Sequence, residues 1–570
     1  MDAGLIAPHG GTLVNAQAGQ ERNKILTPMA QGLFDIILND RQTCDLELIA
    51  CGALSPLQGF MTRIDYEAVL DRMSLADGTF WPMPVCLDVD EKTGERLEVG
   101  QSLALRDQEG FLLAVLHLED LWPVDKEREA NKIFGIADPA HYGFAYLMNN
   151  MGRYYLGGKI ELINMPVNYD FKQLRLTPQE VRYNIRKLGW QRVAGLVTRS
   201  PLHRPHVEMT LATMREIRAN LLVMPVVGIT RAEDYDYYTR VRCYRSITGY
   251  YPPDSVMVSL LPFKLREAGP REALLQAIIA KNYGATHFIV GPQQASPPSL
   301  SDGTAFYEPN QAKDLAMAME DRLGLKVVTV DEMVYCPSED KFCFEPDCPP
   351  GTQSVSMSNE ELRLRIRTGR KIPEWASYPE VIRELRRAFP PPRKQGITVF
   401  LTGLSGAGKS TIAKILYARF MEIGDRPVTL LDGDIVRRNL SSELGFSKEH
   451  RDINVRRIGY VASEITKNRG IAICAPIAPY AQTRLDVRRE IERYGGFIEV
   501  FVSTPLEVCE LRDRKGMYAK ARAGLIQGFT GVDDPYMEPV APEIKVDTTN
   551  LTPEEAAQEI LLFMGHKGYI

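Results

Sequence analysis

Eight residues at 403–410 have the composition and spacing of a phosphate-binding loop. They read Gly-Leu-Ser-Gly-Ala-Gly-Lys-Ser and fit the pattern Gly-x-x-x-x-Gly-Lys-[Ser/Thr], with an apolar β-branched run before them and a helical pattern after them. The glycines let the backbone curl so that several N–H groups point at one phosphate chain, and the helix start adds its positive dipole end. Lys409 can reach the outer phosphates and Ser410 can hold Mg²⁺. Because strand and helix are both in place, we prefer nucleoside triphosphate binding to a chance Gly-rich turn.

A second set of chemically useful residues follows the next strand pattern of the chain. Asp432 and Asp434 flank a glycine where that strand ends, and strand ends of an open parallel sheet line the ligand crevice. Carboxylates there can order Mg²⁺-bound water or take a proton from an acceptor hydroxyl. A plain Asp-Gly turn is the alternative.

Basic residues are dense downstream of these aspartates. The anion-binding candidates are Arg437, Arg438, Arg451, Asn454, Arg456 and Arg457. A solvated charged face is the usual meaning of such a run, but beside a phosphate loop we prefer a second anionic substrate. Residues 512–536 add Lys515, Lys520 and several glycines, a composition that suits a mobile lid over phosphates.

The first half of the chain has one candidate site of its own, at 198–206. Thr198 and Arg199 end a strand pattern, and His203 and His206 stand three apart where a helix pattern begins. Such residues at a helix start can grip a triphosphate at the bond to be broken. A polar loop with structural histidines explains the motif equally well.

The elements that must position these residues indicate an α/β protein. In the last part of the chain, strand patterns alternate with helix patterns at 397–402, 428–431, 471–475, 497–502 and 544–546. From about residue 170, strand patterns at 193–198, 221–227 and 287–290 alternate with helix patterns such as 271–282, which predicts a second parallel sheet. Residues 1–165 are strand-rich, with apolar runs at 80–87, 102–105 and 111–116. A stiff Pro run within 389–396 marks the last domain boundary.

Bulk composition excludes several classes of protein. The chain has 570 residues, 44% of them hydrophobic and 25% charged, with a net charge of −5, so nothing favours nucleic acid or an anionic membrane as a partner. No apolar run is long enough to span a bilayer and no secretory signal appears, so we expect a cytoplasmic protein. Nine mostly scattered cysteines suggest a reducing compartment. Cys336, Cys343 and Cys348 do cluster, but without a Cys-x-x-Cys pair or a nearby His their spacing argues against zinc.

The last part of the chain, from about residue 396 to 570, resembles adenylylsulfate (APS) kinase. The resemblance rests on the strings at 402–411, 431–434, 444–447, 520–524 and 529–533. That family phosphorylates the 3′-hydroxyl of APS with MgATP, giving 3′-phosphoadenylylsulfate (PAPS) and ADP. The resemblance implies that Lys409, Asp432 and Asp434 are the catalytic residues. It implies ATP contacts from Gly403, Ser405, Gly406, Ala407, Gly408, Lys409, Ser410 and Thr411, and APS contacts from Arg437, Phe446, Arg451, Asn454, Ile477, Lys515, Lys520 and Phe529. Many members carry a phosphorylatable serine where this chain has Ala478, so a phosphoenzyme at this position is excluded and we expect direct transfer.

The first 390 residues resemble ATP sulfurylase, on the strings at 7–11, 55–61, 157–160 and 225–228. The whole chain is therefore similar to the two-domain sulfurylase–kinase family. This implies a PUA-like mixed β domain (1–168), a Rossmann-like nucleotidyltransferase domain (169–330), a small connecting domain (331–390) and a P-loop kinase domain with a parallel sheet (391–570).

The sulfurylase motifs differ from the family pattern at three places. Val197 stands where the family has a sulfate-binding Gln, and it cannot donate a hydrogen bond. The family's Gly-Arg-Asp-His-Ala-Gly loop reads Gly-Pro-Gln-Gln-Ala-Ser at 291–296, and its Ile-Ser-Gly-Thr reads Met-Ser-Asn-Glu at 357–360. Thr198, Arg199, His203 and His206 remain as a remnant of the site.

Three functions therefore compete. The first is an APS kinase with an inactive sulfurylase-like domain, which we prefer. The second is a working bifunctional enzyme that makes PAPS from sulfate, and the third is a kinase-like domain that only senses PAPS. We expect ATP and APS as partners, Mg²⁺ with ATP through Ser410, no tightly bound organic cofactor, no nucleic acid or membrane partner, and a homo-oligomer.

Overall fold

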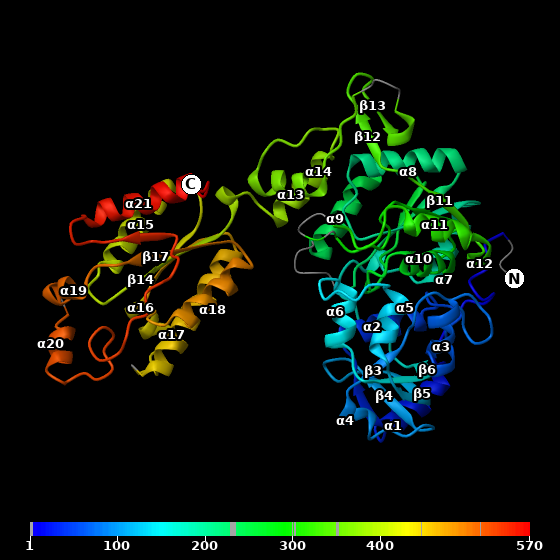
Figure 1. Ribbon diagram of the computed structural model, residues 1–570, viewed down its shortest axis with the longest axis horizontal. Coiled ribbons are helices and arrows are strands. Elements are labelled where there is room, and N and C mark those ends of the chain that lie inside the picture. The colour runs from blue at the N-terminus through cyan, green and yellow to red at the C-terminus, as the bar shows by residue number, and fades with distance from the viewer. Residues whose placement is uncertain are drawn as a thin grey trace. The chain divides into compact units, whose positions relative to one another are not determined.

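The structure, a computed structural model, describes residues 4–228, 235–298, 300, 304–348, 353–445, 447–513 and 515–570, without the side chain of Asp434. The chain forms two compact units (Figure 1). The first contains Met1–Ser358 and Pro373–Glu384, and the second contains Asn359–Ile372 and Leu385–Ile570. Each has its own α/β architecture.

The N-terminal part of the first unit is built on a six-stranded mixed sheet. The strand order is β1-β4-β5-β6-β2, with β3 also paired to β6. The strands are β1 (Phe34–Ile37), β2 (Gly59–Phe60), β3 (Leu87–Val89), β4 (Ser102–Arg106), β5 (Leu112–Pro123) and β6 (Tyr154–Leu162). The helices are α1 (Gln20–Ala30), α2 (Asp40–Ala50), α3 (Arg63–Arg72), α4 (Glu91–Gly94), α5 (Lys126–Ile133) and α6 (Tyr142–Asn150).

One strand expected in this region is wrong in its extent. The apolar run 80–87 joins the sheet only at its end, where β3 begins. Pro82 and Pro84 interrupt the run and remove two backbone donors, so the segment cannot form a continuous ladder. Its side chains are nevertheless core, because Trp81, Met83 and Val85 are fully buried.

A second, parallel sheet follows in the same unit, with the order β11-β10-β7-β8-β9. Its strands are β7 (Val193–Thr198), β8 (Asn220–Pro225), β9 (Val256–Val258), β10 (His287–Val290) and β11 (Lys326–Thr329). Its helices are α7 (Pro178–Lys187), α8 (Arg204–Ile217), α9 (Tyr237–Ile247), α10 (Pro270–Asn282), α11 (Gln311–Ala318) and α12 (Glu320–Leu323). Sequence patterns placed β7 and β10 at their observed bounds. The order, with the first strand in the centre, is that of a Rossmann-like sheet.

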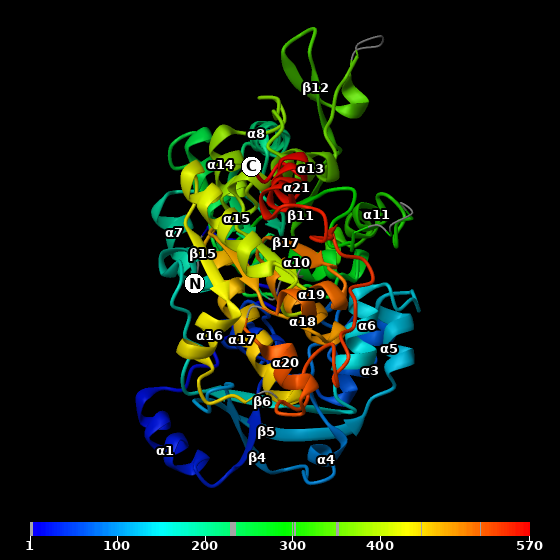
Figure 2. The same ribbon diagram turned by 90° about the vertical axis from the view of Figure 1, so that its left-hand side faces the viewer.

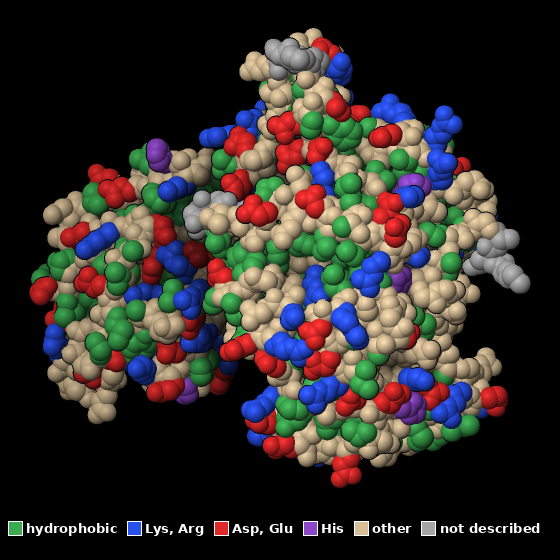
Figure 3. Space-filling model, turned by 45° about the vertical axis from the view of Figure 1, so that its right-hand side comes forward, with side chains coloured by type: hydrophobic (Ala, Val, Ile, Leu, Met, Phe, Trp, Pro, Cys, Tyr) green, Lys and Arg blue, Asp and Glu red, His purple; other side chains and the backbone are tan. Residues whose placement is uncertain are grey.

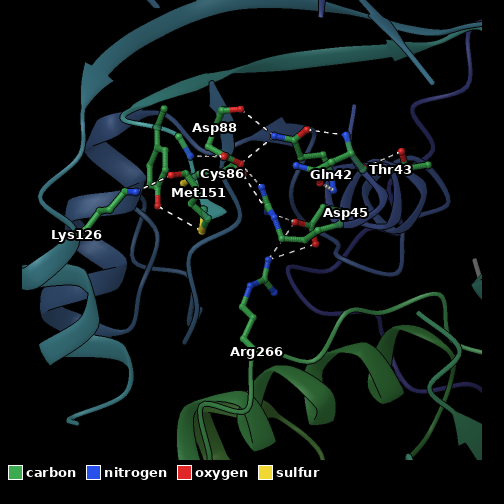
Figure 4. Close-up of polar contacts among 12 residues, drawn as sticks. Gln42, Thr43, Asp45, Cys86, Asp88, Lys126, Met151 and Arg266 are labelled. Carbon is green, nitrogen blue, oxygen red and sulfur yellow. Dashed lines mark hydrogen bonds and ion pairs between the residues drawn. The ribbon is translucent and has the colours of Figure 1, made fainter. Parts of the chain in front are cut away.

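A buried polar network joins these two parts of the first unit (Figure 4). Arg41 on α2 pairs with Asp45, at 2.7 Å, and with Asp88 on β3. Arg266, from the part built on the second, parallel sheet, reaches Asp45 at 3.1 Å. Gln42 donates to the backbone and side-chain oxygens of Asp88. Since hydrophobic residues of both parts also form one continuous cluster, they share a single core.

A small hairpin and two helices follow the second sheet. The hairpin strands are β12 (Met333–Cys336) and β13 (Lys341–Phe344), and they pair antiparallel. The helices are α13 (Asn359–Thr368), which lies in the second unit, and α14 (Pro379–Ala388). Figures 1 and 2 both show the hairpin extending from the first unit beyond α8.

The second unit is a five-stranded parallel sheet with helices on both faces (Figure 1). The strand order is β15-β16-β14-β17-β18, formed by β14 (Ile397–Thr402), β15 (Val428–Asp432), β16 (Ile471–Ala475), β17 (Gly496–Val502) and β18 (Ile544–Val546). Its longer helices are α15 (Lys409–Ile423), α16 (Gly433–Leu440), α17 (Lys448–Lys467), α18 (Ala481–Glu492) and α21 (Pro553–His566), and the short α19 (Leu506–Arg512) and α20 (Met517–Arg522) lie between β17 and β18. Helices α15 and α21 contribute to one hydrophobic cluster, and α17 and α18 to another. All five strand predictions are confirmed.

The surface is polar and mixed in charge. On the face shown in Figure 3, Lys and Arg side chains alternate with Asp and Glu side chains. Within the described residues, no helix combines the length and apolar character needed to cross a bilayer.

Candidate functional site

The loop 403–410 connects β14 to α15 and takes the curled form that its glycines allow. Gly403, Gly406 and Gly408 have φ of 145°, 77° and 106°. A Cβ at Gly403 would lie 2.4 Å from the carbonyl oxygen of Val502. Only glycine tolerates both this close approach and this backbone conformation.

Lys409 lies at the first position of α15, with its side chain buried. Its Nζ donates to the carbonyl oxygens of Gly403 at 2.9 Å and Leu404 at 2.7 Å, so the ammonium group lies inside its own loop. Thr504 and Thr548 donate to the carbonyl oxygen of Ala407 at 3.1 and 2.9 Å. These contacts fix the carbonyl oxygens of the loop, so that its backbone N–H groups can contact phosphate.

The residues predicted to serve Mg²⁺ lie at the start of α15 and at the end of β15. Ser410 is exposed in the first turn of α15, and Asp432 is the last residue of β15. A hydroxyl and a carboxylate are oxygen donors of the kind that Mg²⁺ accepts together with phosphates. Asp434 follows in α16, but its side chain lies outside the described residues.

Among the residues predicted to bind APS, two arginines are held by other residues of the protein. One asparagine has an acceptor oxygen without a hydrogen-bond partner among the described residues. Arg437 donates to the carbonyl oxygens of Leu444 at 3.3 Å and Gly445 at 2.9 Å. Arg451 donates to Thr530 Oγ1 at 2.6 Å and pairs with Asp534 at 3.0 Å. Asn454 is 6% exposed and its Oδ1 has no hydrogen-bond partner among the described residues, which suits a contact to a ligand.

The segment predicted to form a lid carries three of the remaining candidates, Lys515, Lys520 and Phe529. Phe529 packs edge-on against Tyr518 of α20, with ring centroids 5.0 Å apart. The backbone N–H groups of Gly528 and Phe529 donate to Asp533, which lowers the pKa of that carboxyl. The other candidates are exposed Lys515, exposed Lys520 and half-buried Ile477, whose carbonyl oxygen accepts from Thr402. Phe446 lies outside the described residues.

A pocket of about 510 Å³ opens beside the phosphate loop. It lies at the carboxyl end of β17 and is lined by Leu404, residues 501–506, residues 531–536 and Glu538. Its size falls in the range of small-molecule sites, and its position matches the crevice at the strand ends of open α/β sheets.

The residues of the candidate sulfurylase site in the first unit form hydrogen bonds and ion pairs with other residues of the protein. Arg199 pairs with the buried carboxylate of Glu267 and donates to the carbonyl oxygen of Ser296. Thr198 accepts from the backbone N–H of Ser200 at 3.3 Å. Val197 is 3% exposed and belongs to the core. Gln294, in the altered loop, donates to the carbonyl oxygen of Val197 and to Gln276.

Both histidines of this site are uncharged at neutral pH. His203 is 6% exposed, its Nδ1 lies 2.8 Å from Ser377 Oγ, and its backbone N–H donates to His206. Burial, with a smaller contribution from His206, lowers the pKa of His203 to about 3. Burial also lowers the pKa of His206. Neither imidazole therefore offers positive charge to a triphosphate.

Comparison with known proteins covers nearly the whole chain. Family models match as PUA-like domain at residues 6–165, ATP-sulfurylase at 172–388 and adenylylsulphate kinase at 395–547. A sulfate adenylyltransferase of Mycosarcoma maydis is 45% identical over 573 residues, which are 98% of each chain. The chain belongs to the two-domain ATP sulfurylase/APS kinase family. It carries an ATP-sulfurylase domain and an APS kinase domain.

Two further relatives agree with this assignment. A sulfate adenylyltransferase of Phaeosphaeria nodorum is 45% identical over 99% of both chains. The solved structure of a hexameric APS kinase from Thiobacillus denitrificans superimposes with a TM-score of 0.82 at 42% identity, covering 99% of this chain and 100% of that one. The match extends over both domains, so the fold is shared throughout.

Sequence reasoning missed the partners that hold the site residues of this sulfurylase/kinase chain. Thr530 and Asp534 fix Arg451, and they stand in or beside the 529–533 string, so that string was an available signal. Glu267 neutralises Arg199 from 68 positions away, on a segment without periodic pattern, and no local signal points to it.

Proposed function

We propose that this protein is an APS kinase, which transfers the γ-phosphate of ATP to the 3′-hydroxyl of APS and releases PAPS and ADP. The observation that carries the proposal is the complete phosphate loop, with buried Lys409, together with the anchored Arg437 and Arg451 in the same unit. Ser410 and Asp432 would hold the Mg²⁺ that accompanies ATP, and the ion would offset charge on the phosphate oxygens. Phosphoryl transfer rests on positioning and charge, which this arrangement supplies.

Direct transfer between the two bound substrates is part of the proposal. Ala478 is buried and has no hydroxyl, so this position cannot carry a phosphate. The pocket beside the loop offers space for part of one nucleotide, and Asn454 and Phe529 offer a polar and an aromatic contact for the other.

We further propose that the ATP-sulfurylase domain has lost its activity. Sulfate binding requires several donors that replace strong hydration, and Arg199 is already paired with Glu267. Each missing hydrogen bond to a charged ligand costs about 1.5–3 kcal/mol, or roughly ten- to a hundredfold in binding. Gln294, which stands in the place of a loop histidine, removes a further contact to ATP.

A working bifunctional enzyme is the second candidate, because relatives 45% identical over nearly the full length are named sulfate adenylyltransferase. Assays of both half-reactions on the purified full-length protein separate the two. We expect PAPS and ADP from MgATP and APS. We expect neither pyrophosphate release from ATP with saturating sulfate nor ATP formation from APS and pyrophosphate. A sulfurylase rate comparable to the kinase rate would restore the bifunctional function, and a missing kinase rate would refute the main proposal.

The hexameric relative also motivates an assembly proposal: this chain forms a homo-oligomer. Light scattering after size-exclusion chromatography measures its mass against the 64.1 kDa of one chain. A monomer at micromolar concentration would contradict it.

A further inference from the structure

A small cavity lies within the first unit, where the part built on the six-stranded sheet meets the part built on the parallel sheet. Its volume is about 40 Å³, which is room for a small ion or a few water molecules. Helices α5 and α6 and the segment before β3 form most of its wall, and residues 264–266, between β9 and α10, complete it. The wall is mainly apolar, but it carries three cationic side chains, those of Arg41, Lys264 and Arg266. Three cations around so small a volume require negative charge nearby.

Lys264 is buried without a counter-charge of its own. It is 4% exposed, and its Nζ makes no hydrogen bond or ion pair with any residue that the structure describes. Its contacts are aromatic, because Nζ lies 3.4 Å from the ring centroid of Tyr146 and 5.8 Å from that of Tyr142, both on α6. Burial, followed by the charges of Arg41 and Arg266, lowers the pKa of Lys264 to about 8, so the ammonium group still carries its charge at pH 7. Ring faces replace only part of its lost hydration, and buried lysines are almost always paired.

The two arginines add donors that also lack partners. Nε of Arg41 and Nη1 of Arg266 are enclosed and have no hydrogen-bond partner among the described residues. Arg41 binds Asp45 and Asp88 through its two Nη atoms, and Nη2 of Arg266 also reaches the carboxylate of α2 (Figure 4). An unsatisfied buried donor is destabilising. Two of them beside an unpaired ammonium group therefore indicate an acceptor that the chain itself does not supply.

The charged groups around the cavity leave one positive charge unbalanced. The three cations face two carboxylates, Asp45 and Asp88, and both carboxylates are bound to the arginines. A monovalent anion balances the remaining charge. A dianion such as sulfate would instead leave excess negative charge in a largely apolar cavity, where uncompensated charge is costly.

Glu129 is the carboxyl group on the wall of the cavity itself. Its Oε2 accepts hydrogen bonds from the hydroxyls of Tyr66 and Tyr155 at 3.0 and 2.8 Å, and burial raises its pKa, which favours the uncharged form. Where Glu129 is ionised, its charge is offset by Lys126, a further cation that acts on it. The excess of positive charge at Lys264 remains in either state.

We propose that this cavity binds one small monovalent inorganic anion, chloride being the example, through Nζ of Lys264, Nε of Arg41 and Nη1 of Arg266. Water molecules can accept from the same donors, but they bring no charge and leave the ammonium group unpaired. Because the ion contacts both α2 and residues 264–266, it joins the two parts of the first unit. It is a structural ligand of that unit, whereas the phosphate loop belongs to the second unit.

Diffraction from crystals of the full-length protein tests the site directly. After transfer into sodium bromide, data at the bromine absorption edge should show an anomalous peak in contact with all three nitrogen atoms. Crystals held in sodium gluconate should show no such peak, because gluconate carries no anomalous scatterer and is too large for the cavity. A cavity that holds only water in bromide would overturn the proposal.

Unfolding in solution tests whether the ion binds outside a crystal. At equal ionic strength, sodium chloride should raise the midpoint of the first unit's thermal transition by a few degrees over sodium gluconate, since a ligand bound only by the folded state stabilises it. Lys264→Met approximately keeps the length of the side chain and removes its charge, so most of this shift should disappear. In gluconate the variant should be at least as stable as wild type, because it buries no unpaired charge.

The matched control is Lys172→Met, which removes an exposed lysine whose Nζ lies 5.8 Å from the ring centroid of Tyr169. This variant should keep the full chloride shift. Equal shifts in wild type and Lys264→Met would refute the site. Sulfate stabilises most folded proteins, so each salt is judged by the difference between wild type and Lys264→Met. A larger difference in sulfate than in chloride would refute the monovalent ion.

Two further measurements keep the proposal separate from folding and from kinase activity. If Lys264→Met fails to fold, the bromide data on the wild-type protein still decide. APS kinase activity should be the same in wild type and Lys264→Met, so failure of the anion proposal and failure of the kinase proposal are distinguishable.

Discussion

The ammonium group of Lys409 is held within 3 Å of two carbonyl oxygens of its own loop, those of Gly403 and Leu404. These bonds fix a positive charge within the loop. A charge fixed in advance needs little reorganisation when the phosphates arrive, and this is the main source of catalysis in phosphoryl transfer.

Replacement of Lys409 by alanine should therefore lower PAPS formation by several orders of magnitude while the fold survives. The measurement is the rate of PAPS formation from MgATP and APS, with circular dichroism as a check on folding. The control is Lys414→Ala, an exposed lysine one turn further along α15, which should retain the wild-type rate. A Lys409→Ala enzyme with full rate would rule out the assigned site.

His203 should make the first unit sensitive to acid. Its pKa in the folded state, about 3, lies below the value of about 6.5 in the unfolded chain, so between these values the unfolded state binds more protons. Stability is therefore intact above pH 6.5 and falls as the pH drops toward 3. Between pH 7 and pH 5 the loss should be about 2 kcal/mol.

The measurement for His203 is urea unfolding of wild type and His203→Asn at both pH values. Asparagine keeps a polar partner for Ser377 but does not titrate, so the variant should lose less stability on acidification. Equal losses in the two proteins would show that the acid sensitivity has another source.

At the scale of elements, Asp45 joins helix α2 to the part built on the second sheet through Arg41 and Arg266 (Figure 4). Its side chain is 1% exposed, so Asp45→Ala would leave two guanidinium groups without their shared counter-charge. Loss of one partner of a buried pair costs about 3–5 kcal/mol. Denaturant unfolding of the first unit measures this cost. Asp71→Ala, which removes a half-exposed carboxylate from surface ion pairs, should cost less than about 1 kcal/mol.

Elements with a strong local signal were predictable from the sequence, and those set by distant contacts were not. The loop at 403–410 and strands β14 and β16 were placed correctly, since motif, β-branched composition and flanking helices agree there. Strands β9 and β11 were missed because each has only three or four residues and is held in place by its sheet neighbours. The Arg199–Glu267 pair was missed for the same reason, because packing of segments distant in the sequence creates it.

At the scale of the whole molecule, the two units have separate hydrophobic cores. The large cluster of the first unit contains residues up to Leu325, and the clusters of the second unit begin at Ile397. Residues that pack into different cores stabilise different cooperative units, so each unit should unfold in its own transition.

Ligands should therefore move only the transition of the unit that binds them. MgADP at a hundred times its dissociation constant adds about 2.7 kcal/mol to the unit that it binds, which for a unit of this size corresponds to roughly 5–10 °C. Calorimetry of the full chain should show one transition that rises with MgADP and one that does not. In Lys409→Ala the first of these shifts should largely disappear. A single transition that moves as a whole with MgADP would show that the two units unfold together.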